Sequence, residues 1–383
     1  SRAETSLIAC VDTTGSATPQ PILSINPQLD ASLPYRNLAF YVISPVADSD
    51  AAVEEHRAFL GERGMVGRVY ICADGINAQV SGTTKQCEEY RGYCHATLGA
   101  GASSPILFKE DPVPELSYPR LRVKHRRLVS QTADEGGRDL RVDLADRGVD
   151  LTPEEWERML ASPETPIVLD VRNDYEWDVG RFDRAERPSP STFSESDENA
   201  YGLPADPETR EQTPVMMYCT GGIRCEYFSA RLKANGFKKV YKLQGGIQHY
   251  GNAYAKEQRA PPHWQGSLFV FDRRNTVPLG GAESNVVGKC LHCGSPTETF
   301  VNCGNIDCNK LHLVCKACLP VTGGFCCEPC SSAPRRRPLA DPALTQGAPP
   351  GGADPNRLSS IKPRNIGRKE FDVDAHGYRE GAQ

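Results

Sequence analysis

The sequence predicts an α/β domain, with a parallel sheet and helices on both faces, between an α+β domain and a cysteine-rich module. Strand-like and helix-like segments alternate over residues 150–257, and residues 34–130 follow the order β-α-β-β-α-β. Nine of the 15 cysteines lie between Cys290 and Cys330, which marks the third part. With 383 residues, the chain is long enough for two or three such parts.

The two ends of the chain differ in amino-acid composition from its middle. Residues 1–33 are polar and rich in Thr, Ser and Pro, which is typical of a flexible leader or of the remnant of a targeting peptide. Residues 331–383 are rich in Pro, Gly and Arg and contain few large apolar residues, so we expect a disordered basic tail. The chain has no apolar run of about 18 residues, so no membrane segment is expected.

The first domain is predicted from short apolar runs separated by turn residues. Gly64 ends the first helix and the pair Asp74-Gly75 marks a tight turn. The expected strands are 38–43, 66–71, 76–80 and 106–109, and the expected helices are 51–63 and 84–98. This order predicts a ferredoxin-like, or acylphosphatase-like, domain over residues 34–130.

A basic strand is expected after this domain's last helix, over residues 121–129, and it has two interpretations. Because the net charge of the chain is −5, any surface for nucleic acid must be local. Charges on an edge strand prevent aggregation, whereas a basic stripe binds phosphates. The candidate RNA-binding residues are Arg120, Arg122, Lys124, Arg126 and Arg127.

The second domain, residues 150–257, carries the candidate catalytic residue. Thr152 and Pro153 begin a helix, and strands are expected at 166–171, 214–218 and 239–243, with helices at 226–235 and 247–256. Residues 183–213 are expected to be an irregular surface excursion. In parallel sheets, reactive groups lie at the carboxyl ends of strands, and Cys219 follows the strand 214–218.

The segment 219–224 has the pattern of an anion-binding loop. A thiol between a strand end and a helix N-terminus is stabilised as thiolate, with a pKa of about 3.5–7.5. Cys219 is therefore the candidate nucleophile, with Arg224 stabilising its anion, and the alternative is an inert buried cysteine. Cys225 is either a resolving thiol or, as we favour, a packing residue of the helix. The cradle for the anion consists of Thr220, Gly221, Gly222 and Ile223.

The cysteine-rich module, residues 267–330, is predicted to bind metal. Four close pairs of cysteines supply eight thiolates, enough for two tetrahedral zinc sites of structural type. Zinc would supply the folding energy that the few apolar residues cannot. His292 and His312 are possible substitute ligands, the pairing is left open, and a disulfide-linked module is the alternative. The predicted ligands are Cys290, Cys293, Cys303, Cys308, Cys315, Cys318, Cys327 and Cys330.

The loop Cys219-Thr-Gly-Gly-Ile-Arg224 resembles the active-site loop of rhodaneses, and the resemblance extends over residues 150–257. It implies a buried structural pair of Arg172 and Glu176, in the segment that begins at Asp170, as support for the site. Related phosphatases have one more residue in the loop, so this loop suits a single sulfur or another small group.

A wider resemblance covers residues 37–330, which look like the tRNA uridine hydroxylase family. The matching stretches are 67–79, 169–180, 217–226, 243–247, 269–272 and the cysteine-rich end. The resemblance implies hydroxylation of the wobble uridine in the tRNA anticodon loop to 5-hydroxyuridine, with molecular oxygen as co-substrate. It implies that Cys219 is catalytic, as nucleophile or persulfide carrier, and that the first domain and the basic strand position tRNA.

Two other functions are weighed against this one. The first is a sulfurtransferase that moves sulfur from thiosulfate through a Cys219 persulfide. The second is a non-catalytic binding module, against which the intact Cys219 and Arg224 argue. No Gly-rich dinucleotide loop is found, so no nucleotide cofactor is expected. The cysteine content favours a reducing intracellular compartment, either the cytoplasm or an organelle such as a plastid, and the oligomeric state is left open.

Overall fold

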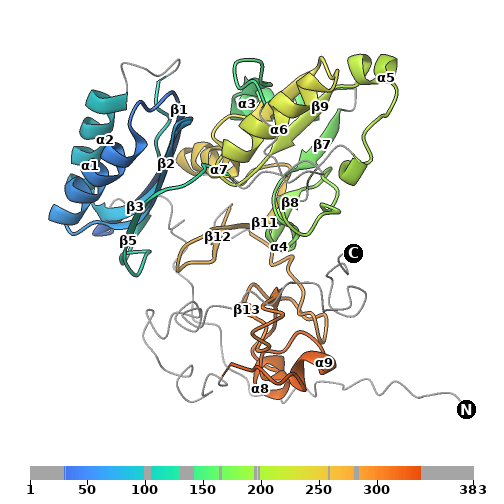
Figure 1. Cartoon of the computed structure of the whole chain (residues 1–383). Coiled ribbons are helices and arrows are strands. Elements are labelled where there is room, and N and C mark those ends of the chain that lie inside the picture. The colour runs from blue at the N-terminus through green and yellow to red at the C-terminus, as the bar shows by residue number, and fades with distance from the viewer. Residues whose placement is uncertain are drawn as a thin grey trace, which may run out of the picture. The chain divides into compact units, whose positions relative to one another are not determined.

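The computed structural model describes two compact units of the chain (Figure 1). One unit spans Ser24–Asn285, and the described part of the other begins at Val286. The described residues are 30, 32–98, 105–129, 142–163, 166–193, 196, 199–257, 259–279 and 284–337. The predicted tail beyond residue 337 and nearly all of the predicted leader 1–33 lie outside the described residues.

The first domain is a five-stranded sheet with the strand order β4-β1-β3-β2-β5. Its first four strands are antiparallel neighbours, and β5 pairs in parallel with β2. This arrangement confirms the predicted ferredoxin-like order. The elements are β1 (Tyr35–Ile43), α1 (Ser49–Glu62), β2 (Val66–Cys72), β3 (Gly75–Thr83), α2 (Thr84–Leu98), β4 (Lys109–Val113) and β5 (Leu121–His125).

The strand alternation of this sheet separates an apolar face from a polar face. Phe40, Val69 and Ile76 are buried in one apolar cluster with residues of α1 and α2, which cover that face. Their neighbours in sequence, such as Tyr70 and Asn77, point the other way because side chains alternate along a strand. The polar face is therefore left available to build a binding site.

The fourth strand lies later in the sequence than predicted. Residues 106–109 were expected as the strand, whereas β4 pairs with β1 from Lys109 to Val113. Pro112 favours ending the strand earlier, but β4 is at the edge of the sheet, where a missing N–H is tolerated.

The second domain contains a four-stranded parallel sheet with the order β6-β10-β9-β7. Its strands are β6 (Val149–Leu151), β7 (Ile167–Asp170), β9 (Val215–Tyr218) and β10 (Val240–Leu243). Its helices are α3 (Pro153–Leu160), α4 (Asp174–Trp177), α5 (Pro207–Gln212), α6 (Ile223–Ala234) and α7 (Gly246–Lys256), and a 3-10 turn spans Asn199–Tyr201. A smaller antiparallel sheet joins β8 (Gly180–Phe182), β11 (Trp264–Phe269) and β12 (Thr276–Pro278).

Strand β9 shows why this sheet is covered on both faces. All four of its residues are fully buried. Val215 and Met217 join one apolar cluster, which includes residues of α6, while Met216 and Tyr218 join another, which includes residues of α3 and α7. The continuous apolar run therefore predicts a central parallel strand correctly.

The segment 183–213 is more ordered than predicted. Asp206 caps the short helix α5 by accepting a hydrogen bond from the N–H of Thr209, and Pro207 occupies the first turn. Phe193 and Leu203 are buried in the same apolar cluster as α6. Most of the described segment is irregular, as expected, but it is not confined to the surface, because these two apolar residues anchor it to the core.

The unit that begins at Val286 holds the cysteines in short elements. These are the hairpin β13 (Phe300–Asn302) and β14 (Leu311–Leu313), followed by α8 (Cys318–Thr322) and α9 (Glu328–Ser331). Arg337 donates to the main-chain oxygen of Cys303 at 3.1 Å, and Arg335 pairs with Asp307. Contacts of the cysteine-bearing segment therefore extend beyond residue 330, the predicted end of the module.

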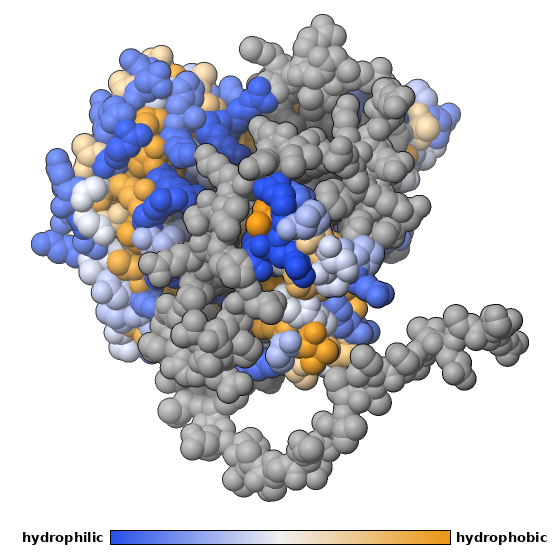
Figure 2. Space-filling view, turned by 60° about the horizontal axis from the view of Figure 1, so that its bottom comes forward, coloured by the Kyte–Doolittle hydropathy of each residue, from blue (hydrophilic) through white to orange (hydrophobic). Residues whose placement is uncertain are grey.

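Among the described residues, no helix is both long and apolar enough to cross a membrane. In the space-filling view, hydrophilic and hydrophobic residues are interspersed over the described surface (Figure 2).

Candidate functional site

The loop after β9 wraps main-chain N–H groups around the sulfur of Cys219. Gly222 has a φ of 98°, a left-handed conformation that favours glycine, and it directly precedes α6. Its N–H donates to the Cys219 Sγ at 3.1 Å. A Cβ at Gly222 would also lie 3.1 Å from the hydroxyl of Tyr41. The glycine is therefore needed both for the turn and for the close approach of the first domain.

The Cys219 thiol is strongly acidified. Burial by itself would raise its pKa, but three other effects outweigh it and lower the pKa to about 5. A hydrogen bond from the Cys225 thiol contributes most, followed by the charge of Arg224 and by main-chain N–H groups. Cys219 is therefore a thiolate at neutral pH. Cys225 is buried as predicted, but it also contacts the reactive sulfur.

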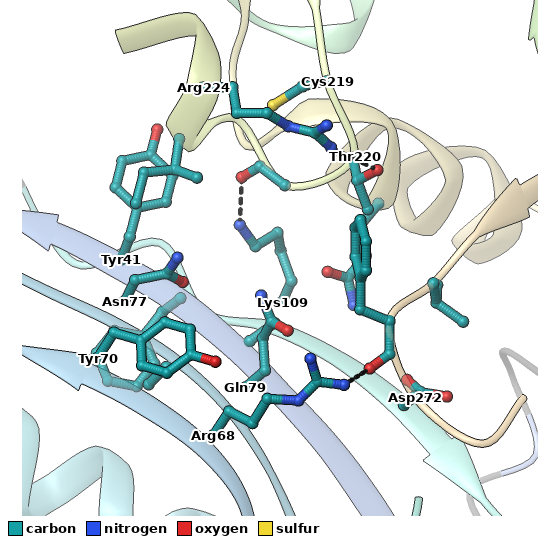
Figure 3. A pocket seen from close by; sticks show the side chains of 18 of the residues that line it. Tyr41, Arg68, Tyr70, Asn77, Gln79, Lys109, Cys219, Thr220, Arg224 and Asp272 are labelled. Atoms are coloured by element: carbon teal, nitrogen blue, oxygen red, sulfur yellow. Dashed lines mark hydrogen bonds between the residues drawn. The ribbon is translucent and has the colours of Figure 1, made fainter. Parts of the chain in front are cut away.

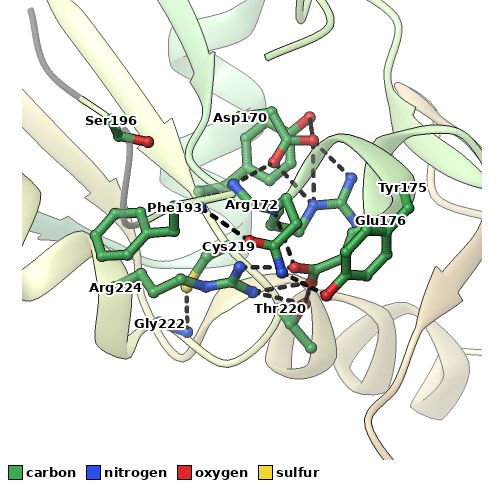
Figure 4. A network of polar contacts seen from close by, with 12 residues as sticks. Asp170, Arg172, Tyr175, Glu176, Phe193, Ser196, Cys219, Thr220, Gly222 and Arg224 are labelled. Atoms are coloured by element: carbon green, nitrogen blue, oxygen red, sulfur yellow. Dashed lines mark hydrogen bonds and ion pairs between the residues drawn. The ribbon is translucent and has the colours of Figure 1, made fainter. Parts of the chain in front are cut away.

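Arg224 is held beside the loop by a bidentate ion pair. Its two terminal nitrogens lie 2.7 and 2.9 Å from the carboxylate of Glu176, whose side chain is fully buried (Figure 4). Thr220 donates its hydroxyl to the same carboxylate at 2.7 Å. Burial would raise the pKa of Glu176, but Arg224 and these hydrogen bonds outweigh that effect and lower it. The carboxylate therefore fixes both ends of the loop.

The predicted pair of Arg172 with Glu176 is wrong. Arg172 instead binds Asp170, with its terminal nitrogen 2.6 Å from the carboxylate, and also donates to the main-chain oxygen of Gly180. Tyr218 donates to Asp170 at 2.8 Å. Glu176 is occupied by Arg224, so the segment contains two ion pairs rather than one. Glu176 holds Arg224 beside the loop, and support of the site by Asp170 and Arg172 stays a prediction.

The loop opens on a cavity of about 430 Å³ whose walls come from both domains of the unit. Figure 3 shows Cys219, Thr220 and Arg224 on one side and the strand residues Tyr70 and Gln79 on the other. The cavity is lined by the polar face of the first sheet, because the apolar face is covered by α1 and α2.

Lys109 reaches the loop from the first domain, and no pattern in the sequence predicts this contact. Its ammonium donates to the main-chain oxygen of Gly221 at 2.7 Å and lies 5.3 Å from the ring centre of Tyr41 (Figure 3). Burial lowers its pKa to about 8, against the opposing effect of the nearby Cys219 anion. A lysine at the end of the expected strand 106–109 has the pattern of a surface residue, so only the fold reveals its role.

Further polar contacts connect the two domains around the cavity. Tyr41 donates to Glu226 at 2.7 Å, and Gln248 donates to Asp111 at 3.0 Å. Arg68 donates to the main-chain oxygen of Phe271 (Figure 3). In each pair, a residue of the first domain contacts a residue more than a hundred positions later in the chain. The cavity therefore forms only when both domains of the unit are packed together.

The predicted basic strand lies at the edge of the first sheet. The regular strand β5 is shorter than predicted, and Arg120, Arg122, Lys124, Arg126 and Arg127 are all exposed. The guanidinium of Arg126 lies 5.1 Å from the ring centre of Tyr70, which lines the cavity. The position of this basic strand is compatible both with protection of a sheet edge and with phosphate binding. RNA binding by these residues therefore stays a prediction.

The cysteines of the second unit form two groups of four that could each hold a metal ion. One group is Cys290, Cys293, Cys315 and Cys318, and the other is Cys303, Cys308, Cys326 and Cys330. Sulfur–sulfur distances are 3.6 Å for Cys293–Cys315 and 3.7 Å for Cys308–Cys326. Cys326 stands in the second group where Cys327 was predicted: its sulfur lies 3.7 Å from that of Cys330, and Cys327 is at the N-cap position of α9.

The fold and the loop define a rhodanese-domain protein with an acylphosphatase-like domain in front. Family models match in the same order: the UPF0176 acylphosphatase like domain at 35–129, the rhodanese-like domain at 152–253 and the rhodanase C-terminal region at 265–331.

Curated relatives identify the family. The tRNA uridine(34) hydroxylase of Protochlamydia amoebophila (strain UWE25) is 43% identical over 302 residues, which cover 79% of this chain and 89% of that protein. The protein of the same name from Chlamydia abortus (strain DSM 27085 / S26/3) is 40% identical over 311 residues, covering 80% and 90%. The chain belongs to the tRNA uridine(34) hydroxylase family. A solved rhodanese-like domain protein from Staphylococcus aureus is 20% identical, with a TM-score of 0.23, over 27% of this chain and 90% of that one.

Proposed function

We propose that this protein hydroxylates the wobble uridine of tRNA to 5-hydroxyuridine, using molecular oxygen. The observation that carries the proposal is the acidified Cys219, which opens on a cavity built by both domains. The cavity volume of about 430 Å³ falls in the usual range for small-ligand sites. A single base turned out of an RNA loop is a ligand of that size, and the relatives' shared name supports uridine as this base.

The cavity wall has the groups that recognise an unpaired base. Proteins hold such bases by stacking on aromatic rings and by hydrogen bonds to the base edges. Tyr70 and Phe271 offer rings, while Asn77 and Gln79 offer side-chain amides that can pair with the alternating acceptors and donor of a uracil edge. The exposed basic strand beside Tyr70 would hold the phosphates of the anticodon loop.

The chemistry assigns separate tasks to the residues of the loop. Cys219 acts as the nucleophile or carries a persulfide, and it is already ionised at neutral pH. Gly222 and Arg224 stabilise its anionic forms, because donors fixed in a dry site need no rearrangement during the reaction. Lys109 places a further positive charge on the opposite wall.

We infer that both cysteine groups bind structural zinc. Tetrahedral coordination with Zn–S bonds of about 2.3 Å places ligand sulfurs about 3.8 Å apart. The distances of 3.6 and 3.7 Å agree with that geometry and are far longer than a disulfide bond of about 2.05 Å. Four thiolates leave no open position for substrate, so the ions would stabilise the module rather than react.

The experiment is nucleoside mass spectrometry of tRNA from a deletion strain complemented with variants. Wild type should restore 5-hydroxyuridine, and Cys219→Ala should not. Cys94→Ala, which changes a buried cysteine of the first domain, is the control and should restore it. Unchanged 5-hydroxyuridine in the deletion strain would refute the proposal.

The rival sulfurtransferase is tested with the same proteins. Turnover of thiosulfate and cyanide by purified wild type, together with normal 5-hydroxyuridine in the deletion strain, would favour it. Since the proposed substrate is tRNA, the enzyme would work in the cytoplasm or in an organelle with its own tRNA.

A further inference from the structure

We propose that Cys219 and Cys225 form a redox pair that supplies the two electrons needed for each hydroxylation. Hydroxylation by dioxygen places one oxygen atom on the base and must reduce the other to water. The inference rests on the proposed function, because the pair would serve as the electron source for that reaction. It gives Cys225 a task beyond packing.

The geometry places both cysteines against one short loop in a closed space. Cys219 lies at the end of β9 and Cys225 in the first turn of α6, and the loop between them folds back through Gly222. The N–H of Cys225 donates to the main-chain oxygen of Gly222 at 3.1 Å, and the N–H of Gly222 donates to the Cys219 sulfur at 3.1 Å. Both cysteines are fully buried in one apolar cluster, and the Cys225 thiol donates to the Cys219 sulfur.

The two thiols differ in protonation in the way that a redox pair requires. Cys219 is ionised, whereas burial and the neighbouring Cys219 anion raise the pKa of Cys225, which therefore stays protonated. The Cys219 thiolate takes the second oxygen atom of dioxygen as a sulfenate. The Cys225 thiol then attacks the Cys219 sulfur and closes the disulfide, and the oxygen leaves as water with the Cys225 proton and one proton from solvent.

The overall reaction balances. Uridine, dioxygen, the Cys219 thiolate, the Cys225 thiol and one proton give 5-hydroxyuridine, water and one disulfide. The C5–H bond and the O–O bond break, and a C5–O bond and a sulfur–sulfur bond form. Dioxygen accepts four electrons, two from the base and two from the thiols. The water takes one proton from Cys225 and one from solvent, because Cys219 is already ionised.

Another molecule must then reduce the disulfide, and the cavity determines which of the two sulfurs it can attack. Cys219 lines the cavity, whereas Cys225 is not among the described residues that line it. A low-molecular-weight thiol or a dithiol protein would therefore attack the Cys219 sulfur and release Cys225 first.

The alternative is that Cys225 only donates a hydrogen bond, and two substitutions separate the two roles. Cys225→Ser keeps a donor at this position but cannot form a disulfide, and Cys225→Ala loses both. We expect both variants to lose more than about tenfold in the rate of 5-hydroxyuridine formation on tRNA in air. Cys225→Ser should nevertheless keep the low pKa of Cys219, measured as the pH midpoint of its alkylation. A wild-type rate for Cys225→Ser would overturn the proposal.

A direct measurement follows the disulfide itself. Reduced wild type is mixed with tRNA in air without added thiol, and the digest is analysed by mass spectrometry without reduction. Trypsin cleaves after Arg224, so the disulfide would join peptide 211–224 to peptide 225–231. We expect one disulfide per 5-hydroxyuridine formed, and renewed product after a thiol is added.

The controls distinguish failure of this inference from failure of the proposed function. Product formed while both cysteines remain reduced would refute the redox pair and leave the hydroxylase intact. Disulfide that accumulates equally without tRNA would also count against the pair. Absence of 5-hydroxyuridine from wild type, with thiol and oxygen present, would refute the proposed function itself.

Discussion

Titration of Cys219 is the sharpest test of the electrostatics of the loop. With a pKa of about 5, against an ordinary value near 9, the sulfur is about 99% thiolate at neutral pH, compared with about 1% for an ordinary thiol. The thiolate fraction at neutral pH is therefore about a hundredfold higher. The intrinsic nucleophilicity of a thiolate falls with its pKa, however, with a Brønsted slope of about 0.4–0.5, and this lowers the alkylation rate by roughly fifty-fold. The alkylation rate at neutral pH is therefore not diagnostic, and the pH midpoint is.

The assay measures alkylation of Cys219 by iodoacetamide between about pH 4 and about pH 9, with peptide 211–224 quantified by mass spectrometry. The rate should rise to a plateau with its midpoint near pH 5. The same peptide in urea-unfolded protein should give a midpoint near the ordinary value for a thiol, about 9. A midpoint above about 8 in the folded protein would refute the reasoning.

The same titration affects stability with a definite sign. A depressed folded-state pKa adds stability that is fully present above the unfolded pKa, near 9, and is lost as the pH falls toward 5. Four pKa units correspond to at most about 5 kcal/mol. The stability difference between wild type and Cys219→Ser, measured by urea unfolding, should shrink by an amount of that order as the pH falls through this range. A difference that does not change with pH would contradict the assignment.

Further predictions test the surroundings of the loop and the second unit. Glu176→Gln leaves the charge of Arg224 buried without its partner and should cost about 3–5 kcal/mol in urea unfolding; a loss below about 1 kcal/mol would contradict this. Lys109→Met removes a positive charge near Cys219 and should raise its alkylation midpoint, whereas the control Lys85→Met, at an exposed lysine, should not. Alanine at both Arg122 and Lys124 should weaken tRNA binding and reduce its salt-dependence slope by about 2, and an unchanged slope would remove the strand from the RNA site. A strong chelator should unfold the cysteine module, and elemental analysis should find two zinc ions per chain; fewer than one would count against both sites.

The sequence was sufficient where the chemistry is local. The run that becomes β9, the glycines after it and Arg224 are neighbours in the chain, so the loop and its thiolate could be derived from spacing. The same holds for the split βαβ order of the first domain, because turn residues separate its elements.

The sequence was insufficient where distant residues meet. Lys109 and Gly221 are 112 positions apart, and no pattern in either segment indicates the contact. The resemblance to rhodaneses predicts Arg172 as the partner of Glu176, whereas the partner in the structure is Arg224, which lies 48 positions away in sequence. The exchange of Cys326 for Cys327 depends on the direction that the chain takes into α9, which spacing alone does not specify.

The reach of Lys109 across the two domains has a consequence for how this chain can evolve. Neither domain encloses the reactive sulfur by itself, so the surface where they meet is subject to selection for reactivity as well as for assembly. A replacement there that leaves both domains folded can still inactivate the protein. Variation at this junction should therefore be as restricted as in the loop itself, although most of its residues never touch the sulfur.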